Sequence, residues 1–321
     1  MLSVLIPIYN EEEQIPLTLA ALQDVLKDLA ESYEILACDD GSFDRSWELL
    51  VRQQAVIPKL RLLRFSRNFG KEAAILALLE AARGDAVVLM DADLQHPPRY
   101  IPEMLKLWRE GAEIVDGVKI ARQTESRLKR WAARSFYRLF RRLSGLDLQN
   151  ASDFKLLDRK AVRAYLACPE ERPFFRALSA WIGFRRVALP FEVAERRLGK
   201  SKWSARQLFA LSYEAFTSFS SAPLRLVPLL GLIFWLFALG LGIQTLVHWA
   251  RGESAGGFPT VILLILITGG AIMLALGLIG SYLGRIYAEI KRRPRYILME
   301  TREATGEKGG EISADARCGA E

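Results

Sequence analysis

Short, continuously apolar runs alternate with segments of helical spacing from Met1 to about Leu189. The apolar runs occupy residues 3–9, 33–40, 59–66 and 85–93. Apolar residues recur at helical spacing in residues 13–30, 46–55 and 71–82. A strand that is apolar throughout is typical of a sheet covered on both faces. Strands separated by helices therefore predict an α/β fold with a mostly parallel sheet and right-handed crossovers.

Two long segments toward the C-terminus contain no charged residue. Residues 227–249 would span about 34 Å as a helix, enough to cross the hydrocarbon core of a bilayer. Residues 261–283 form a second such run. Two runs of this length favour membrane helices over the buried helices of a soluble protein.

Basic residues flank the two apolar runs on their outer sides. They are Lys202, Arg206 and Arg225 before the first run, and Arg285, Lys291, Arg292, Arg293 and Arg295 after the second. The loop between the runs holds one Arg and one Glu. The positive-inside rule then places both ends of the chain and the large N-terminal domain in the cytoplasm.

Two further segments are suited to a membrane surface. Residues 126–145 combine Leu, Trp and Phe with Arg127, Lys129, Arg130, Arg134, Arg138, Arg141 and Arg142. This pattern predicts a basic amphipathic helix on an anionic bilayer, and the alternative is a solvated basic face of a soluble domain. Residues 203–226 lead into the first membrane helix and are expected to lie along the bilayer. The polar, glycine-rich residues after Met299 predict a disordered tail.

The composition indicates the class of binding partner more clearly than it indicates the fold. The 321 residues carry a formal net charge of +7, so we expect a polyanionic partner: nucleic acid, anionic lipid or a phosphorylated substrate. Cys38, Cys168 and Cys318 have no CxxC spacing, which favours free thiols in a reducing compartment. The first residues lack a basic region and turn acidic at once, so we do not expect a signal peptide.

Polar clusters follow three of the predicted strands. The segment PIYNEEE follows the first strand, Asp39 and Asp40 end the second, and Asp91 and Asp93 end the fourth. Because ligands of open α/β sheets bind beyond the carboxyl ends of the strands, we expect these carboxylates around one crevice. They would repel one another unless a cation compensates, and oxygen ligands suit Mg²⁺ or Mn²⁺. His96 stands beside two prolines, and we interpret it as structural rather than as a metal ligand.

Four motifs occur in a fixed order along the α/β part of the chain: VLIPIYNEEE, ILACDDGSFD, SRNFGKEAA and MDADLQHPP. They resemble the motifs of family-two inverting glycosyltransferases with the GT-A fold. The later segments SDFKLLDRKAV, WIGFRR, RRLGKSKW and SFSSAPLR, with two membrane helices, are similar to the polyprenyl-phosphate branch of that family. That branch includes dolichyl-phosphate mannose synthases and bacterial undecaprenyl-phosphate glucosyltransferases. The resemblance runs from about Leu2 to Tyr296.

The resemblance implies roles for individual residues. The nucleotide-sugar pocket would be lined by Pro7, Tyr9, Glu11, Asp39, Asp40, Arg67, Lys71 and Asp91. The metal ion, Mg²⁺ or Mn²⁺, would be held on the donor diphosphate by Asp91, Asp93 and Gln95. The phosphate of donor or acceptor would be bound by Lys119, Arg122, Arg196, Ser201 and Lys202. The catalytic residues would be Asp153 at the reaction centre, Asp93 and Lys202.

The expected reaction transfers a sugar from a nucleoside diphosphate to a polyprenyl phosphate. Negative charge grows on the leaving diphosphate, where a metal ion and basic side chains stabilise it. The acceptor is a phosphate monoester with a second pKa of about 6, so it is largely dianionic at neutral pH and already a nucleophile. We therefore expect Asp153 to orient the acceptor or neighbouring groups rather than to remove a proton.

The resemblance leaves donor and acceptor open to alternatives. UDP-glucose is the expected donor, because SRNFGKEAA and SDFKLL are most similar to the bacterial glucosyl branch, and GDP-mannose and UDP-aminoarabinose are the alternatives. Rival functions are transfer to another lipid such as diacylglycerol and an inactive scaffold that binds nucleotide sugars. The intact Asp91, Asp93, Asp153 and Lys202 argue against the scaffold. Leu128 stands where the QxxRW motif of processive synthases has Gln, which argues against processive synthesis.

The chain is expected to divide into four parts. They are a GT-A domain at residues 1–200, interfacial helices at 201–226, a two-helix transmembrane region at 227–286, and a basic, disordered cytoplasmic tail at 287–321. We expect a multi-pass protein of the plasma (inner) membrane, and the family branch implies a homotetramer. No nucleic-acid-binding motif accompanies the basic helix, so nucleic acid is not an expected partner.

Overall fold

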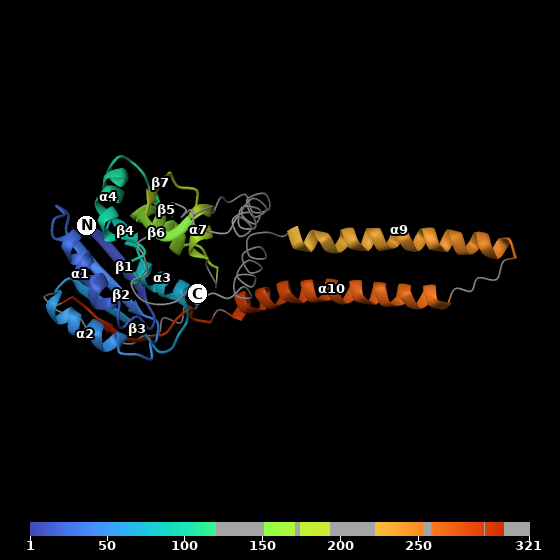
Figure 1. Cartoon of the computed structure of the whole chain (residues 1–321), viewed down its shortest axis with the longest axis horizontal. Coiled ribbons are helices and arrows are strands. Elements are labelled where there is room, and N and C mark those ends of the chain that lie inside the picture. Colours follow the sequence, from blue (N-terminus) through green and yellow to red (C-terminus); the bar gives the residue numbers. More distant parts are fainter. Residues whose placement is uncertain (120–150, 171–173, 193–221, 253–257, 292, 305–321) are drawn as a thin grey trace. The chain divides into compact units, whose positions relative to one another are not determined.

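The computed structural model describes residues 1–119, 151–170, 174–192, 222–252, 258–291 and 293–304 (Figure 1). The chain divides into two compact units. One comprises Met1–Arg141, Leu146–Ser201 and Arg293–Glu321, and the other Arg142–Gly145 and Lys202–Arg292. The predicted basic helix at 126–145 and most of the predicted interfacial segment at 203–226 lie outside the described residues.

One mixed sheet forms the first unit. Within the described residues it has eight strands in the order β7-β5-β6-β4-β1-β2-β3-β8. The strands are β1 (Leu2–Ile8), β2 (Tyr33–Asp39), β3 (Leu60–Phe65), β4 (Ala86–Leu89), β5 (Ile114–Lys119), β6 (Ala151–Asp158), β7 (Arg186–Phe191) and β8 (Leu298–Arg302). β1 is parallel to β2 and β4, and β3 is parallel to β2, as the alternation of strands and helices predicts. β6 runs antiparallel to β4 and β5.

The helices of the first unit begin where the sequence supplies a suitable first turn. They are α1 (Ile15–Leu26), α2 (Ser46–Val56), α3 (Lys71–Ala81), the 3₁₀ turn η1 (Pro98–Tyr100), α4 (Ile101–Arg109), α6 (Arg159–Leu166) and α7 (Phe175–Trp181). Proline stands in the first turn of α1 and α4, where its missing N–H costs no helical hydrogen bond. The side chain of Asp158 caps α6 by accepting a hydrogen bond from the backbone N–H of Lys160.

Helices cover both faces of the sheet. Residues of α1, α2 and α4 pack into one buried apolar cluster, and residues of α3, α6 and α7 pack into another (Figure 1). Side chains of β1 alternate between them: Leu2 and Val4 belong to the first cluster and Leu5 to the second. This two-sided burial explains why the strands are apolar throughout.

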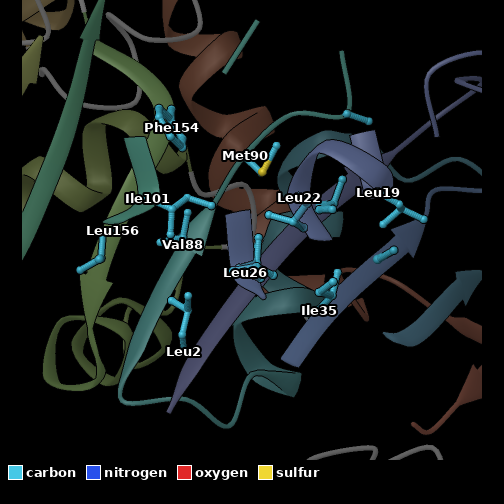
Figure 2. Packing of buried hydrophobic residues seen from close by; sticks show 14 of the residues in the cluster. Leu2, Leu19, Leu22, Leu26, Ile35, Val88, Met90, Ile101, Phe154 and Leu156 are labelled. Atoms are coloured by element: carbon cyan, nitrogen blue, oxygen red, sulfur yellow. The ribbon is translucent and has the colours of Figure 1, made fainter. Parts of the chain in front are cut away.

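The α1 side of the core is shown in Figure 2. Leu22 and Leu26 of α1 lie over the strands that carry Ile35 and Val88, and all four side chains are fully buried. Truncation of a buried leucine to alanine costs about 2–5 kcal/mol, because a cavity remains. The core therefore fixes β1, β2 and β4 relative to one another, and with them the loops at their carboxyl ends.

Two long apolar helices, α9 (Ala222–Ala250) and α10 (Phe258–Lys291), lie side by side in the second unit (Figure 1). Within them, Val227–His248 and Ile267–Gly284 are long and apolar enough to cross a membrane. Their apolar side chains are exposed all around, as in Trp235 and Leu274. A helix that is hydrophobic on every side needs apolar surroundings, so both are candidate membrane spans.

The structure corrects two expectations. β4 ends at Leu89, four residues before the predicted strand end at Asp93, because the chain turns there into a loop. The prediction of a disordered tail from Glu300 was wrong for Glu300 to Arg302, which belong to β8. β8 pairs antiparallel with β3, so this part of the tail gains backbone hydrogen bonds that its polar composition did not reveal.

Candidate active site

The predicted site residues gather at the carboxyl ends of β1, β2 and β4. β1 lies between the other two and is parallel to both, so the loops that follow these strands leave the same edge of the sheet. β6 brings Asp153 to this region from the antiparallel side, next to β4. Ligands of open α/β sheets bind at such an edge.

The loop after β1 is joined to the loop after β2 by reciprocal hydrogen bonds. The backbone N–H of Asn10 donates to Ser42 Oγ (2.9 Å), and the backbone N–H of Phe43 donates to Asn10 Oδ1 (2.9 Å). The backbone N–H of Glu11 donates to Ser46 Oγ (3.0 Å). Asn10 has a φ of 52°, in the left-handed region that asparagine tolerates better than most residues. The two loops therefore form one rigid wall.

Two aromatic rings stand exposed on this wall. Tyr9, a predicted pocket residue, meets Phe43 edge-on with 6.5 Å between ring centroids. Phe43 is 86% exposed, and the sequence analysis did not assign it a role. Pro7 is partly buried in β1, two residues before Tyr9. Exposed rings beside polar side chains offer a stacking surface for a planar ligand.

Asp40 holds the loop that precedes α3, at the sheet edge formed by the carboxyl ends of β1, β2 and β4. Its carboxylate accepts hydrogen bonds from the backbone N–H groups of Phe69 (2.7 Å) and Gly70 (2.9 Å). Burial raises the pKa of Asp40 to about 6, although these hydrogen bonds oppose the rise. Gly41 has a φ of +65°, and a Cβ there would lie 2.5 Å from the carbonyl carbon of Arg67. Any side chain at position 41 would therefore clash with this loop, so the close approach requires Gly41.

Asp39 is the more buried of the two neighbouring carboxylates. It is fully buried, and its Oδ1 accepts a hydrogen bond from the backbone N–H of Ser42 (3.2 Å). Its Oδ2 lies 3.4 Å from Nε of Arg64. Burial raises the pKa of Asp39, and the hydrogen bonds from Ser42 and the charge of Arg64 limit the rise. Its contact with a nucleotide stays a prediction.

The loop after β4 carries the predicted metal ligands and is closed by its own side chains. The backbone N–H of Asp91 donates to Nδ1 of His96 (3.1 Å), and the backbone N–H of Gln95 donates to Oδ1 of Asp93 (3.0 Å). Thr18 Oγ1 donates to the carbonyl oxygen of Ala92 (2.5 Å). These bonds fix the direction of the loop as it leaves the sheet.

His96 is buried beneath this loop, and its ring packs against a strand of the sheet. It is 2% exposed, and its ring stacks on Phe154 at 5.3 Å between centroids and an interplanar angle of 8°. Burial lowers the pKa of His96, the charge of Asp91 opposes this change, and the charges of Lys119 and Lys71 add to it. A neutral imidazole can accept the Asp91 N–H at Nδ1 while Nε2 carries the hydrogen.

Asp153 lies at the centre of a cluster of ion pairs. Lys71 Nζ is 2.6 Å from Asp153 Oδ2 and also 2.6 Å from Asp91 Oδ1. Arg176 donates from Nε to Asp153 Oδ1 (2.6 Å) and from Nη2 to Asp153 Oδ2 (2.8 Å). Lys71 thus joins the loop after β4 to β6, and Arg176 joins α7 to the same carboxylate.

The ion pairs determine the protonation states in this cluster. Burial by itself would raise the pKa of Asp153, but Lys71 and Arg176 outweigh it and hold that pKa well below the usual range. For Lys71 and Arg176 both effects have the opposite sign. Burial lowers their pKa values, but the charges of the neighbouring carboxylates outweigh burial and raise both pKa values. The cluster therefore contains an ionised Asp153 between two permanent cations at neutral pH.

Glu72 connects α3 to the first residue of α7. Its Oε2 accepts a hydrogen bond from the backbone N–H of Phe175 (2.9 Å), a group at the helix N-terminus that lacks a helical partner. Burial, followed by the charge of Asp153, raises the pKa of Glu72 to about 7. Glu72 thereby fixes the start of the helix that carries Arg176.

The predicted phosphate-binding residues are only partly described. Lys119 ends β5 and is half-buried, and burial lowers its pKa, as does the charge of Arg176, while Asp91, Asp93 and Asp153 oppose the change. Arg67, which was predicted for the nucleotide-sugar pocket instead, is exposed, with its guanidinium 4.5 Å from the ring centre of Phe69. The remaining predicted members, Arg122, Arg196, Ser201 and Lys202, lie outside the described residues.

The donor set after β4 suits a hard divalent cation. Asp91 and Asp93 offer carboxylate oxygens and Gln95 an amide oxygen, all from one ordered loop. Over the described ranges of the chain, no group of three or more His, Cys, Asp or Glu side chains is placed to hold a metal ion. Two carboxylates and one amide from this loop match how Mg²⁺ binds together with substrate phosphates.

Arg176, Glu72 and Phe43 are site residues that sequence reasoning missed. Glu72 and Phe43 stand in the motifs SRNFGKEAA and ILACDDGSFD, but the resemblance assigned them no role, and Arg176 stands in none of the motifs. A charged residue at the start of a short helix, 23 positions after Asp153, gives no local signal of its partner. Only the packing of α7 against β6 brings Arg176 to the carboxylate.

The fold and the acidic edge together define a glycosyltransferase with a GT-A-like sheet. The chain belongs to the family described as Glycosyl transferase family 2, whose model matches residues 3–166. It is 37% identical over 303 residues to the uncharacterized glycosyltransferase YkcC of Bacillus subtilis (strain 168), covering 93% of both chains. It is 35% identical over 305 residues to the SfII prophage-derived bactoprenol glucosyl transferase of Shigella flexneri, covering 94% of this chain and 98% of that protein.

A solved structure is similar at a lower level of identity. Glucosyl-3-phosphoglycerate synthase from Mycobacterium tuberculosis, in complex with Mn²⁺, uridine-diphosphate-glucose and phosphoglyceric acid, is 21% identical with a TM-score of 0.46. The alignment covers 67% of this chain and 77% of that one.

Proposed function

We propose that this glycosyltransferase transfers glucose from UDP-glucose to a membrane polyprenyl phosphate, with inversion, giving a polyprenyl-phosphate sugar. The observation that carries the proposal is the ion-paired cluster in which Lys71 joins Asp91 to Asp153. It brings the predicted metal loop and the predicted reaction centre into contact. The similarity to bactoprenol glucosyl transferases over nearly the whole chain supports the choice of sugar and acceptor.

The donor side of the site would be built from the loops after β1, β2 and β4. Tyr9 and Phe43 provide an exposed aromatic surface for the nucleobase, next to the buried carboxylate of Asp39. Asp91, Asp93 and Gln95 would hold Mg²⁺ or Mn²⁺, which when bound neutralises charge on the leaving diphosphate. Asp40 acts indirectly, since its carboxylate holds the loop in front of α3.

The phosphate of the acceptor has to be bound by cations rather than deprotonated by a base. A phosphate monoester is largely dianionic at neutral pH, so its oxygen attacks without prior removal of a proton. Asp153 is a poor general base, because both of its oxygens are bound by cations and its pKa lies well below the usual range. We assign Asp153 the role of positioning Lys71 and Arg176 at the reaction centre.

The membrane placement follows from the second unit. Val227–His248 and Ile267–Gly284 are candidate membrane spans, and a polyprenyl phosphate is itself confined to a bilayer. With basic flanks on the outer sides of both spans, the catalytic domain and both ends of the chain would lie in the cytoplasm, at the plasma (inner) membrane. Assembly as a homotetramer stays a prediction.

The test is a transfer assay with purified full-length protein in detergent or vesicles. Radiolabelled UDP-glucose, GDP-mannose and UDP-aminoarabinose are each paired with polyprenyl phosphate and with diacylglycerol, with Mn²⁺ or with EDTA. We expect a labelled lipid only with UDP-glucose, polyprenyl phosphate and metal. Label in polyprenyl phosphate from another donor would change the sugar, and label in diacylglycerol would change the acceptor class. Binding of nucleotide sugars without transfer to either lipid would favour the scaffold.

A further inference from the structure

Lys71 and Arg176, the two cations paired with Asp153, are also exposed enough to contact a ligand. Asp153 is almost fully buried, with 6% of its side chain exposed, whereas the side chains of Lys71 and Arg176 are 41% and 37% exposed. Ion pairs that serve stability alone gain little from keeping both cations at the surface. Here the buried carboxylate anchors the cations, and the cations reach toward the edge of the sheet.

The geometry places both cations within reach of one small anion. Lys71 Nζ and Arg176 Nη2 contact the same oxygen, Oδ2 of Asp153. Arginine has five N–H donors, and Asp153 engages the Nε and Nη2 groups, so the outer edge of the guanidinium can meet a ligand. Such a planar fork matches the oxygen spacing of a phosphate.

The surrounding residues hold this cation pair rigidly. Glu72, next to Lys71 on α3, accepts the backbone N–H of Phe175, which is next to Arg176 on α7. α3 and α7 are therefore tied together one residue away from each cation. A binding group held in this way loses little conformational freedom when its ligand arrives, which favours affinity.

We propose that Arg176, together with Lys71, binds a phosphate group of the reactants, with Asp153 as the residue that positions the pair. The inference rests on the proposed function and adds a binding residue that the sequence analysis did not assign. The shared chemistry is a phosphate oxyanion, which can come from the diphosphate of the donor or from the phosphomonoester of the lipid acceptor. The test separates these two sources.

The experiment compares Arg176→Gln, which removes the charge, and Arg176→Lys, which keeps it, with Arg163→Gln as the matched control. Arg163 is an exposed arginine on α6. All variants are full-length and are first checked for thermal unfolding midpoint. The Kd values of UDP and inorganic pyrophosphate are measured with Mn²⁺ by calorimetry, and the KM for polyprenyl phosphate and kcat are measured in the transfer assay.

For Arg176→Gln we expect at least a tenfold rise in one of these Kd or KM values, partial recovery in Arg176→Lys, and no change in Arg163→Gln. A rise in the Kd of UDP and pyrophosphate assigns the pair to the donor. A rise in the KM for polyprenyl phosphate, with the Kd of UDP unchanged, assigns it to the acceptor. If both Arg176 variants lower kcat or stability while every phosphate affinity stays within twofold, Arg176 only supports Asp153 and the inference is wrong.

Failure of the inference and failure of the proposed function give different results. If no lipid is labelled by wild type but pyrophosphate binding depends on Arg176, the proposed reaction is wrong and the phosphate site stands. If wild type transfers glucose to polyprenyl phosphate and Arg176→Gln leaves all affinities unchanged, the reaction stands and the phosphate site is overturned.

Discussion

The imidazole of His96 accepts a hydrogen bond at Nδ1 from the backbone N–H of Asp91, with 3.1 Å between the two nitrogens. The bond closes the loop that leaves β4, and the ring is held in place by stacking on Phe154. A single buried side chain thus fixes the position from which the Asp91 carboxylate meets Lys71. His96 therefore supports the site by positioning Asp91.

Replacing His96 with Phe should separate its hydrogen bond from its packing. The ring contact with Phe154 would be kept, but the N–H of Asp91 would lose its acceptor. We expect unfolding to become easier by about 1 kcal/mol, the lower end of the cost of an unsatisfied buried N–H, because this N–H is only partly buried. We also expect a smaller Mn²⁺-dependent shift in melting temperature on UDP binding, since Asp91 would be less well placed. A His96→Phe protein with unchanged stability and unchanged UDP binding would rule out this role.

Asp153→Asn tests whether Asp153 positions cations or removes a proton. Asn keeps the shape of the side chain and loses the charge. If Asp153 positions Lys71 and Arg176, we expect activity to fall by about tenfold or less, the lower edge of typical acid–base contributions, with the acidic limb of the pH profile unchanged. The measurement is kcat against pH for both proteins. A fall of about 10⁴-fold together with loss of the acidic limb would make Asp153 a general base.

Glu72 should make stability depend on pH near neutrality. Its pKa is raised by burial from the ordinary 4.5 to about 7, so between these values the folded protein binds more protons than the unfolded chain. The free energy of unfolding therefore falls as pH rises through that window, by about 1.4 kcal/mol per unit for one proton. Glu72→Gln should lack this decline, so its stability relative to wild type should increase from pH 5 to 7 and then level off.

The measurement is chemical unfolding of both proteins at pH 5, 6, 7 and 8. Glu48→Gln, a change at an exposed glutamate on α2, controls for the loss of one negative charge. The burial of Asp40 acts in the same direction, because its pKa is also raised, so only the difference between wild type and Glu72→Gln isolates Glu72. A constant difference across this range would contradict the assignment.

The sheet edge could be predicted from the sequence because its signals are local. The apolar runs and helical segments of the first ninety or so residues set β1 to β4 and α1 to α3 within a few residues of the predicted limits. The strand order then placed Asp39 and Asp91 on one edge without knowledge of side-chain contacts. The other residues of the donor site were predicted from the resemblance of the motifs.

Strands β5 to β7 were harder to recognise because charged residues interrupt each of them. Asp116, Lys155 and Arg186 come from β5, β6 and β7 in turn, and Asp116 bonds to both of the others. Lys155 is fully buried. Their charges interrupt the hydrophobic pattern, and only the cross-strand pairing explains why they are tolerated.

The end of the chain was misjudged for a related reason. β8 has the sequence LMETR, which is too short and too polar to signal a strand by itself. It is stabilised by pairing with β3, more than two hundred residues earlier. Tyr296, just before it, stacks on Phe65 with 4.9 Å between ring centroids. Contacts over such a separation in sequence leave no local pattern.

Glu303→Gln should weaken the attachment of this C-terminal segment to the catalytic domain. Both oxygens of Glu303 accept hydrogen bonds from the Arg61 guanidinium (2.9 and 3.2 Å), whose Nη1 also donates to buried Glu34 (2.8 Å). Because the Arg61 side chain is only 9% exposed, loss of one partner should cost about 1–3 kcal/mol. The readout is the thermal midpoint of the full-length protein in detergent. Glu300→Gln, which removes an exposed pair with Arg302, is the control and should cost less than about 1 kcal/mol. Equal shifts for the two variants would show that burial of Arg61 does not strengthen this contact.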